Sequence, residues 1–265
     1  MKPDTDFSIR TILGGYDRNF TYIITCMRTG IQVCVDAAVD RSSIETYIRS
    51  EPAALLVTHT HGDHSPGAIP LQKATGAELV GIPAPDAEGQ DKSFSPDRLW
   101  QHDDILDCGE YSIQLVHTPG HVSNHVCYLL EQEKLLFTGD HVLQGTTSVI
   151  LPPDGDMSDY LDSLRYLQSL DLTFFAPGHG DVMDQPEKEL KNLVAHRLRR
   201  EQKVINCLTK LGSSGIDSLV LSVYDDVAQH LIPWAKRTLL AHLIKLEREG
   251  RVILENDLYM LTQEE

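Results

Sequence analysis

The stretch Thr58–His64 reads Thr-His-Thr-His-Gly-Asp-His, so seven residues carry three imidazoles and one carboxylate. It directly follows the apolar run Ala53–Val57, which favours a buried strand. Imidazoles and carboxylates together are the ligands that zinc, iron and manganese take in proteins. The pattern therefore predicts a metal site on the loop at the end of this strand.

Three later segments bring ligands of the same kinds. His121 stands in Thr-Pro-Gly-His, Asp140 follows Thr-Gly, and His179 stands in Pro-Gly-His-Gly. Each segment comes close behind a strand-like run, so all of them are expected on loops at strand ends. Five histidines and two aspartates supply enough ligands for two metal ions. The predicted metal ligands are His59, His61, Asp63, His64, His121, Asp140 and His179.

The order of the ligands indicates how they divide between the two ions. We expect the first two histidines of the loop to hold one ion together with His121. Asp63 and the histidine after it would hold the other ion with His179, and Asp140 would bridge the two. A hydroxide shared by such ions is a nucleophile at neutral pH, and the ions polarise a carbonyl or phosphoryl oxygen. Asp63 would also orient the hydroxide, so Asp63 and Asp140 are the candidate catalytic residues.

Two threonines near the ligands are candidates for a supporting role. A ligating imidazole needs a hydrogen-bond partner for its other ring nitrogen, because that bond fixes the ring and its tautomer. Thr58 directly precedes one ligand, and Thr118 stands shortly before another. Their hydroxyls are therefore candidate partners.

The first part of the chain alternates short β-rich runs with helical segments, which is typical of sheets covered by helices. Ser42–Glu45 predicts a helix start, and apolar residues at helical spacing over Ser158–Leu170 predict another helix. The runs before His59 and Asp140 are similar, which indicates two similar sheets with the ligands along one shared edge. The expected strands are Ser8–Leu13, Thr21–Thr25, Ile31–Val35, Ala53–Val57, Glu78–Val80, Tyr111–Val116, Val126–Leu130, Lys134–Phe137 and Thr173–Phe175.

The C-terminal part has a different pattern. Glu187–Leu211 predicts one long helix, and Gly212–Gly215 predicts a break without regular structure. A second helix and a β pair follow, which is the outline of a winged-helix module. We therefore expect a catalytic domain over residues 1–186 and a helical, winged-helix-like domain over residues 187–265. The elements expected after the break are Ser218–Tyr224, a helix over Trp234–Arg248, and strands Arg251–Glu255 and Leu258–Leu261.

Composition limits the class of protein. The chain has 265 residues with 41% hydrophobic content, enough for one large core and a small second one. No apolar run approaches the roughly 20 residues of a membrane span, and Met1–Asp6 does not resemble a signal peptide. The five cysteines are scattered without a disulfide pattern. We therefore expect a soluble, cytoplasmic protein that does not bind membranes.

The charge is unevenly distributed. Residues 187–265 carry twelve basic and twelve acidic side chains, so the whole net charge of −16 belongs to residues 1–186. An acidic body repels polyphosphate at long range, which weighs against a nucleic-acid substrate, although bound metal ions reverse the sign locally. One basic cluster stands out, and it is either a clamp for an anionic substrate or a solvated helix face. It consists of Arg197, Arg199, Arg200 and Lys203.

The ligand segments resemble the metallo-β-lactamase superfamily. The resemblance implies an α/β fold, a four-layer αβ/βα sandwich, with the same seven ligands. Asp140 is similar to the bridging aspartate of the glyoxalase II-like branch. The C-terminal helices and the stretch Leu151–Asp156 resemble the lactamase-like protein 2 subgroup. The matching segments are His59–His64, Thr118–His121, Gly139–Asp140 and Pro177–Gly180.

Three hypotheses of function follow from the residues and the resemblance. The first is a hydrolase with two zinc ions per chain, for which iron or manganese would also suit the ligands. Its metal-bridging hydroxide would attack an ester or thioester. The second is a single-strand endoribonuclease, an activity known around the subgroup. The third is a persulfide dioxygenase with one iron, for which His59, His121 and Asp140 would suffice. We favour the first, with a small acyl substrate rather than RNA, and a homo-oligomer is compatible with it.

Overall fold

The computed structural model describes residues 7–14, 18–38, 43–44, 48 and 52–262. The chain divides into two compact units. The predicted helix start at Ser42–Glu45 lies largely outside the described residues, and the predicted domain division after residue 186 stays a prediction. The first unit takes up residues 1–119, 124–148 and 170–187, and the second takes up residues 120–123, 149–169 and 188–265.

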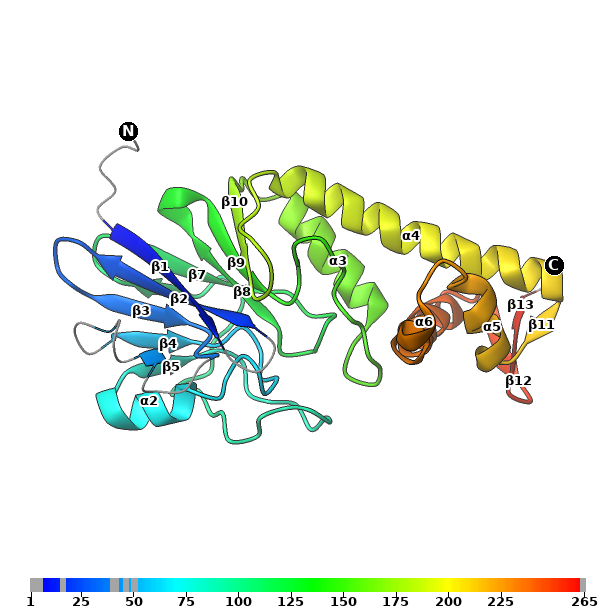
Figure 1. Cartoon of the computed structure of the whole chain (residues 1–265), viewed down its shortest axis with the longest axis horizontal. Coiled ribbons are helices and arrows are strands. Elements are labelled where there is room, and N and C mark those ends of the chain that lie inside the picture. Colours follow the sequence, from blue (N-terminus) through cyan, green and yellow to red (C-terminus); the bar gives the residue numbers. More distant parts are fainter. Residues whose placement is uncertain (1–6, 15–17, 39–42, 45–47, 49–51, 263–265) are drawn as a thin grey trace. The chain divides into compact units, whose positions relative to one another are not determined.

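The first unit contains two five-stranded sheets, and the first of them is formed by the N-terminal strands (Figure 1). Its order is β1-β2-β3-β4-β5. The first three strands pair antiparallel, whereas β3, β4 and β5 run parallel to one another. The parallel strands are short and buried on both faces, as apolar runs predict. The strands are β1 (Phe7–Gly14), β2 (Asn19–Cys26), β3 (Gln32–Val35), β4 (Ala54–Leu56) and β5 (Glu78–Val80).

The second sheet has the order β10-β9-β8-β7-β6. β9 and β10 run parallel, and the remaining neighbours are antiparallel. A short 3₁₀ turn, Glu131–Glu133, joins β8 to β9. The strands are β6 (Ile105–Asp107), β7 (Ser112–His117), β8 (Val126–Leu130), β9 (Leu135–Gly139) and β10 (Phe174–Pro177).

The two sheets share one hydrophobic core. Tyr22 and Val35 of the first sheet belong to the same buried cluster as Leu115 and Phe137 of the second. The opposite face of the first sheet packs on helix α2 (Ala68–Thr75) in a separate cluster. Burial of apolar surface on both faces drives this layered arrangement, at about 25 cal/mol per Å². The core therefore places the ends of the two sheets side by side.

Parallel pairing brings the ligand-bearing loops to one edge. β3 and β4 run parallel, so Asp36 and the loop after β4 leave the first sheet at the same end. β9 and β10 also run parallel, and the N–H of Gly178 donates to the carbonyl of Gly139 at 2.8 Å. The N–H of Val126 in the second sheet donates to the carbonyl of Thr58 at 2.8 Å. This hydrogen bond joins the two sheets beside the predicted metal loop.

The second unit consists of helices and a small antiparallel sheet of order β11-β13-β12. Helix α5, helix α6 and the sheet pack with α4 on a core that includes Val204, Leu219, Leu239 and Val252. Among the described residues, no helix is both long enough and apolar enough to cross a lipid bilayer. The elements are α3 (Met157–Gln168), α4 (Pro186–Leu211), β11 (Ser213–Ser214), α5 (Ile216–Val223), a 3₁₀ turn (Gln229–Leu231), α6 (Ile232–Arg248), β12 (Val252–Glu255) and β13 (Leu258–Leu261).

The expected strands and helices within the described residues are present, with ends that differ by a few residues. The prediction of an irregular break over Gly212–Gly215 is wrong, because Ser213 and Ser214 form a strand that pairs with β13. The sequence does not predict α2 or β6. β6 has only three residues, and α2 begins without a side-chain cap, so neither leaves a strong local signal.

A buried carboxylate stabilises the second unit. Glu201 of α4 is 5% exposed and accepts hydrogen bonds from Lys245 at 2.8 Å and Arg251 at 3.1 Å. Burial opposes its ionisation, but the nearby His242 and Lys245 outweigh that effect and hold the pKa of Glu201 at about 2. The carboxylate is therefore charged wherever the protein is folded near neutral pH.

We predict that Glu201→Gln lowers the free energy of unfolding by about 2 kcal/mol at pH 7. The carboxyl titrates near 4.5 when unfolded and near 2 when folded, so its contribution is complete above pH 4.5. It is lost as the pH falls through 2. Urea unfolding of both proteins from pH 7 to pH 2.5 should show the difference shrinking, while Glu255→Gln on exposed β12 changes little. A difference independent of pH would mean that the charge of Glu201 is not the cause.

Candidate metal centre

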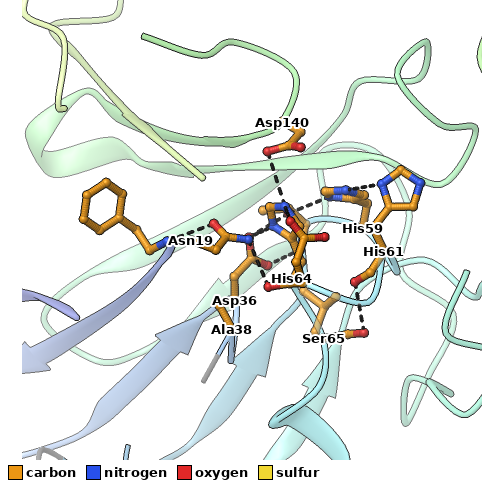
Figure 2. A network of polar contacts seen from close by, with 12 residues as sticks. Asn19, Asp36, Ala38, His59, His61, His64, Ser65 and Asp140 are labelled. Atoms are coloured by element: carbon orange, nitrogen blue, oxygen red, sulfur yellow. Dashed lines mark hydrogen bonds and ion pairs between the residues drawn. The ribbon is translucent and has the colours of Figure 1, made fainter. Parts of the chain in front are cut away.

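The loop after β4 brings the rings of His59, His61 and His64 close together (Figure 2). The N–H of His64 donates to the carbonyl of His61 at 3.0 Å, which closes a tight turn. His59 and His64 are fully buried, and His61 and Asp63 are partly exposed. Because the loop turns rather than extends, neighbouring ligands converge instead of alternating between two faces.

One cluster joins this loop to the end of β10. The ligand atoms of Asp63, His64 and His179 all lie within 4.8 Å of one another. Oδ2 of Asp63 lies 3.5 Å from Nε2 of His64 and 3.4 Å from Nε2 of His179. The structure thus brings together the three residues that the sequence assigns to one ion.

Asp140, at the end of β9, faces the same histidines. Its Oδ1 lies 3.3 Å from Nε2 of His64 and 3.5 Å from Nε2 of His179. Asp140 also forms a second group with His59 and His64, again with ligand atoms within 4.8 Å of one another. A single carboxylate therefore adjoins ligands assigned to both ions, as a bridging ligand must.

The rings of His59 and His61 meet edge to face. Nε2 of His59 lies 2.9 Å from Nδ1 of His61. The hydroxyl of Thr58 donates to Asp36 at 2.8 Å and lies 3.1 Å from Nδ1 of His59. Since that hydroxyl proton is already used, the oxygen accepts the N–H of Nδ1, and Nε2 keeps its lone pair. Thr58 thus has the supporting role that its position in the sequence suggests.

Asp36 supports the candidate ligands, although it is not among the site residues predicted from the sequence. It follows β3 with a φ of 50°, is 2% exposed and lies beside His64 (Figure 2), and it accepts three hydrogen bonds. The donors are the backbone N–H of Thr58 at 2.8 Å, the Thr58 hydroxyl at 2.8 Å and Nδ1 of His64 at 2.9 Å. Asp36 therefore leaves Nε2 of His64 free for a metal. A carboxylate directly after an apolar strand was the signal for it.

Asn19 is a second such residue. It is fully buried at the start of β2, and its Nδ2 donates to the carbonyl of Asp63 at 3.0 Å. Its Oδ1 accepts the N–H of Phe20, which also donates to the carbonyl of Gly178 at 2.8 Å. Asn19 therefore connects the loops that carry Asp63 and His179. An asparagine beside a turn reads as a turn residue, so the sequence carries no signal of this role.

Thr118 has a different partner from the one expected of a ligand support. Its hydroxyl lies 2.9 Å from Nδ1 of His125, which is not among the predicted ligands. The ring of His125 is fully buried, with its centroid 5.2 Å from that of His59. Thr118 and His125 are thus hydrogen-bonded to each other, and the ring of His125 packs beside that of His59.

His121 belongs to the second unit, on the segment Gly120–Ser123 that joins two strands of the first. It is 6% exposed, and its Nδ1 lies 2.6 Å from the carbonyl oxygen of Val149. A carbonyl only accepts, so Nδ1 carries the proton and Nε2 carries the lone pair. This is the tautomer that a metal ligand requires.

The electrostatics of the first unit favour cations at the cluster. Burial opposes the ionisation of Asp63, but the hydrogen bond from His179 and the charge of His64 hold the pKa of Asp63 below its usual value. Burial lowers the pKa of His64, but Asp140 and Asp36 raise it well above its usual value. In the absence of metal, a proton on His64 offsets the charge of these carboxylates, and a metal ion would displace that proton.

The donor set fits transition-metal ions. Nε2 of His64 is buried and makes no hydrogen bond to any described residue, although two carboxylate oxygens lie within 3.5 Å of it. A cation between these atoms would satisfy all of them. Imidazole nitrogens with a few carboxylates suit zinc, iron or manganese, whereas calcium and magnesium prefer oxygen ligands alone.

Gly178 approaches the cluster closely. A Cβ at this position would lie 2.7 Å from Cε1 of His64, 2.9 Å from Oδ1 of Asp140 and 3.1 Å from Oδ1 of Asn19. We predict that Gly178→Ala weakens zinc binding by roughly tenfold or more, because the added methyl group would push the ligand side chains out of their orientation. Zinc titration of the metal-free protein tests this, with Gly215→Ala as the control, since its Cβ would meet only contacts of 3.8 and 4.0 Å. Unchanged affinity would mean that the ligands can move aside.

The basic cluster of α4 is largely engaged within the second unit. Arg197 is 3% exposed, with its guanidinium 5.2 Å from the ring centre of Tyr160. Arg200 makes a bidentate pair with Asp226, at 2.7 and 3.0 Å, and Lys203 pairs with the neighbouring Asp225. Three of the four cationic side chains therefore have partners in the protein, which disfavours the interpretation of a clamp for an anionic substrate.

Comparison with known families identifies both parts of the chain. The family described as the metallo-beta-lactamase superfamily matches residues 37–179, more than half of the chain. The beta-lactamase associated winged helix domain matches residues 216–258. The predicted winged helix is thereby confirmed.

Relatives match over most of the chain. A lactamase-like protein, nscB, of Trichophyton equinum is 28% identical over 93% of this chain and 78% of its own length. A beta-lactamase-like protein 2 homolog of Caenorhabditis elegans is 30% identical over 72% of this chain and 62% of its own length. An atrochrysone carboxyl ACP thioesterase of Passalora fulva is 32% identical over 64% of this chain and 49% of its own length.

Solved structures share the fold. A metallo-beta-lactamase family protein from Thermus thermophilus has a TM-score of 0.75 at 18% identity, covering 97% of this chain and 99% of its own. The protein TTHA1623, solved in a di-iron-bound form, has a TM-score of 0.57 at 21% identity, covering 68% of this chain and 96% of its own. The predicted α/β fold class and the resemblance to lactamase-like proteins are confirmed. With its packed sheets and a cluster of histidines and aspartates at their edge, the chain belongs to the metallo-beta-lactamase superfamily and is a metal-dependent hydrolase.

Proposed function

We propose that this chain is a dinuclear hydrolase that binds two zinc ions and cleaves an ester or thioester of a small acyl group. The observation that carries the proposal is two ligand groups that share His64, in each of which the ligand atoms lie within 4.8 Å of one another. They are Asp63–His64–His179 and His59–His64–Asp140. The two groups adjoin each other, and Asp140 lies near histidines of both. This arrangement supports two ions rather than the single iron of a dioxygenase.

The proposal takes His121 as the remaining ligand of the first ion, together with His59 and His61. Its lone pair on Nε2 supports this role. A backbone hydrogen bond also supports it: the N–H of Thr118 donates to the carbonyl of His125 at 2.9 Å and closes the loop that carries His121. The two ions would lower the pKa of bound water and polarise the acyl carbonyl.

The residues of the chain have separate tasks in this reaction. Asp63 is partly exposed and its Oδ2 faces His64 and His179, so its other oxygen can accept a proton from the attacking water and orient it. Asp140 holds the ligand groups at a fixed separation. Asp36 and Thr58 keep the ligating nitrogens aimed at the cluster.

Three observations support a small acyl substrate. The acidic first part of the chain repels nucleic acid at long range. The basic cluster of α4 is occupied by protein partners. One relative is named as a thioesterase that acts on an acyl carrier protein. A cytoplasmic location fits the five free cysteines, and it stays a prediction, as does the oligomeric state.

The test is hydrolysis of acetyl and butyryl N-acetylcysteamine thioesters by the zinc-loaded full chain, with labelled single-stranded RNA as a parallel substrate. We expect thioester cleavage that a chelator abolishes and added zinc restores, with two zinc ions per chain. Cleavage of RNA without thioester hydrolysis would favour the endoribonuclease instead. One iron per chain, with activity in His61→Ala, would favour the dioxygenase.

A further inference from the structure

The loop that carries His121 is fastened to the segment ahead of α3. Nδ1 of His121 donates to the carbonyl of Val149. The carbonyl of Gly120, the first residue of the loop Gly120–Ser123, accepts a hydrogen bond from the N–H of Asp156 at 2.9 Å. The N–H of Ser123, the last residue of the loop, donates to Oδ1 of Asp154 at 3.1 Å. Three hydrogen bonds over four residues hold this loop in one place within the second unit.

The same loop packs against α3 without space for a methyl group. Gly120 has a φ of 135°, and a Cβ there would lie 2.3 Å from Cα of Tyr160 and 2.4 Å from its backbone nitrogen. A Cβ on Gly155 would lie 3.0 Å from the carbonyl oxygen of His121. Any shift of the first turn of α3 would therefore move His121.

The first turn of α3 is in turn held by the C-terminal helices. Oδ1 of Asp156 caps α3 by accepting the N–H of Ser158 at 2.8 Å and that of Asp159 at 3.2 Å. Its other oxygen pairs with Arg248, the last residue of α6. Burial opposes ionisation of Asp156, but Arg248 and the capped N–H groups hold its pKa below the usual value.

We propose that the winged-helix part of the chain positions the ligand His121, and that Arg248 is the positioning residue, acting through Asp156. The proposal rests on the proposed function, because it takes His121 as a metal ligand. The contacts run without a gap from α6 through Arg248 to the cap of α3, and from there through the backbone to the ligand loop. The C-terminal domain thereby has a role in the hydrolase that does not involve nucleic acid.

The test is zinc titration of the metal-free full chain carrying Arg248→Glu, which places two negative charges together. We expect one of the two metal sites to weaken about tenfold, in the range found when partners of metal ligands are removed. The other site should be unchanged. Arg248→Lys should stay within about twofold of the wild type. Arg165→Glu is the matched control. Arg165 makes an exposed ion pair with Asp162 at 2.8 Å on α3, the helix that Asp156 caps.

A second readout is hydrogen–deuterium exchange over residues 119–124, which should become faster in Arg248→Glu and not in Arg165→Glu. Equal metal affinities in the wild type and Arg248→Glu would overturn the proposal, and so would a loss of stability without a site-specific loss of zinc. His121→Ala separates the ligand role of His121 from the positioning role of Arg248. If His121→Ala keeps both sites, the ligand assignment fails; if it loses one that Arg248→Glu keeps, only the positioning role fails.

Discussion

Asp140→Asn is expected to lower kcat of the zinc-loaded hydrolase by on the order of 10³ while the protein stays folded. Oδ1 of Asp140 lies 3.3 and 3.5 Å from the Nε2 atoms of His64 and His179, so its charge lies between the ligand groups. Asparagine has the same shape but no charge, and it is a poor bridge between two cations. Asp140→Ala removes the contact altogether and should abolish turnover.

The measurement combines steady-state thioester hydrolysis with zinc content and circular dichroism. Asp162→Asn, at an exposed position of α3, is the control for loss of a negative charge. Wild-type kcat in Asp140→Asn would refute the bridging role. Retention of two tightly bound zinc ions with a lost kcat would instead place Asp140 in the chemical step and not in metal binding.

Asp36→Ala is expected to lower the free energy of unfolding by about 3 kcal/mol and to weaken zinc binding by roughly 10- to 100-fold. The substitution leaves three buried donors without their acceptor: the N–H and hydroxyl of Thr58 and the Nδ1–H of His64. It also frees the ring of His64 to rotate or change tautomer. The same residue therefore stabilises the fold and orients a ligand.

Two variants separate these effects from backbone strain at Asp36, whose φ is 50°. Asp103 also has a positive φ, of 70°, but it is exposed, so Asp103→Ala measures the strain together with one exposed side-chain hydrogen bond, from Gln114. Asp36→Asn tolerates the left-handed conformation and keeps one acceptor, so an intermediate effect is expected. Urea unfolding and zinc titration measure the two quantities. If Asp36→Ala costs no more than Asp103→Ala, the hydrogen-bond network does not stabilise the protein.

The sequence by itself predicted the candidate metal ligands and determined the strands that carry them. Ligand types are chemical, and a His-x-His-x-Asp-His loop after an apolar run is a local pattern. The alternation of apolar runs and turns is local as well, so β4, β9 and β10 were predictable. The position of Asp140 after a run like that before His59 also predicted that both would lie at one edge.

The tertiary structure alone decided which other residues serve the ligands. Asp36 and Asn19 lie far from their partners in the sequence, and only the pairing of β2, β3 and β4 brings them to the loop. The basic residues of α4 read as a free cluster in the sequence, whereas the fold places Asp225 and Asp226 beside Arg200 and Lys203.

The same distinction holds for His121. Its type and its Gly-flanked position predict a ligand, but they do not predict what supports it. The hydrogen bonds and close packing around Gly120 attach it to α3. These contacts connect segments that are distant in the chain, and no local pattern encodes such contacts.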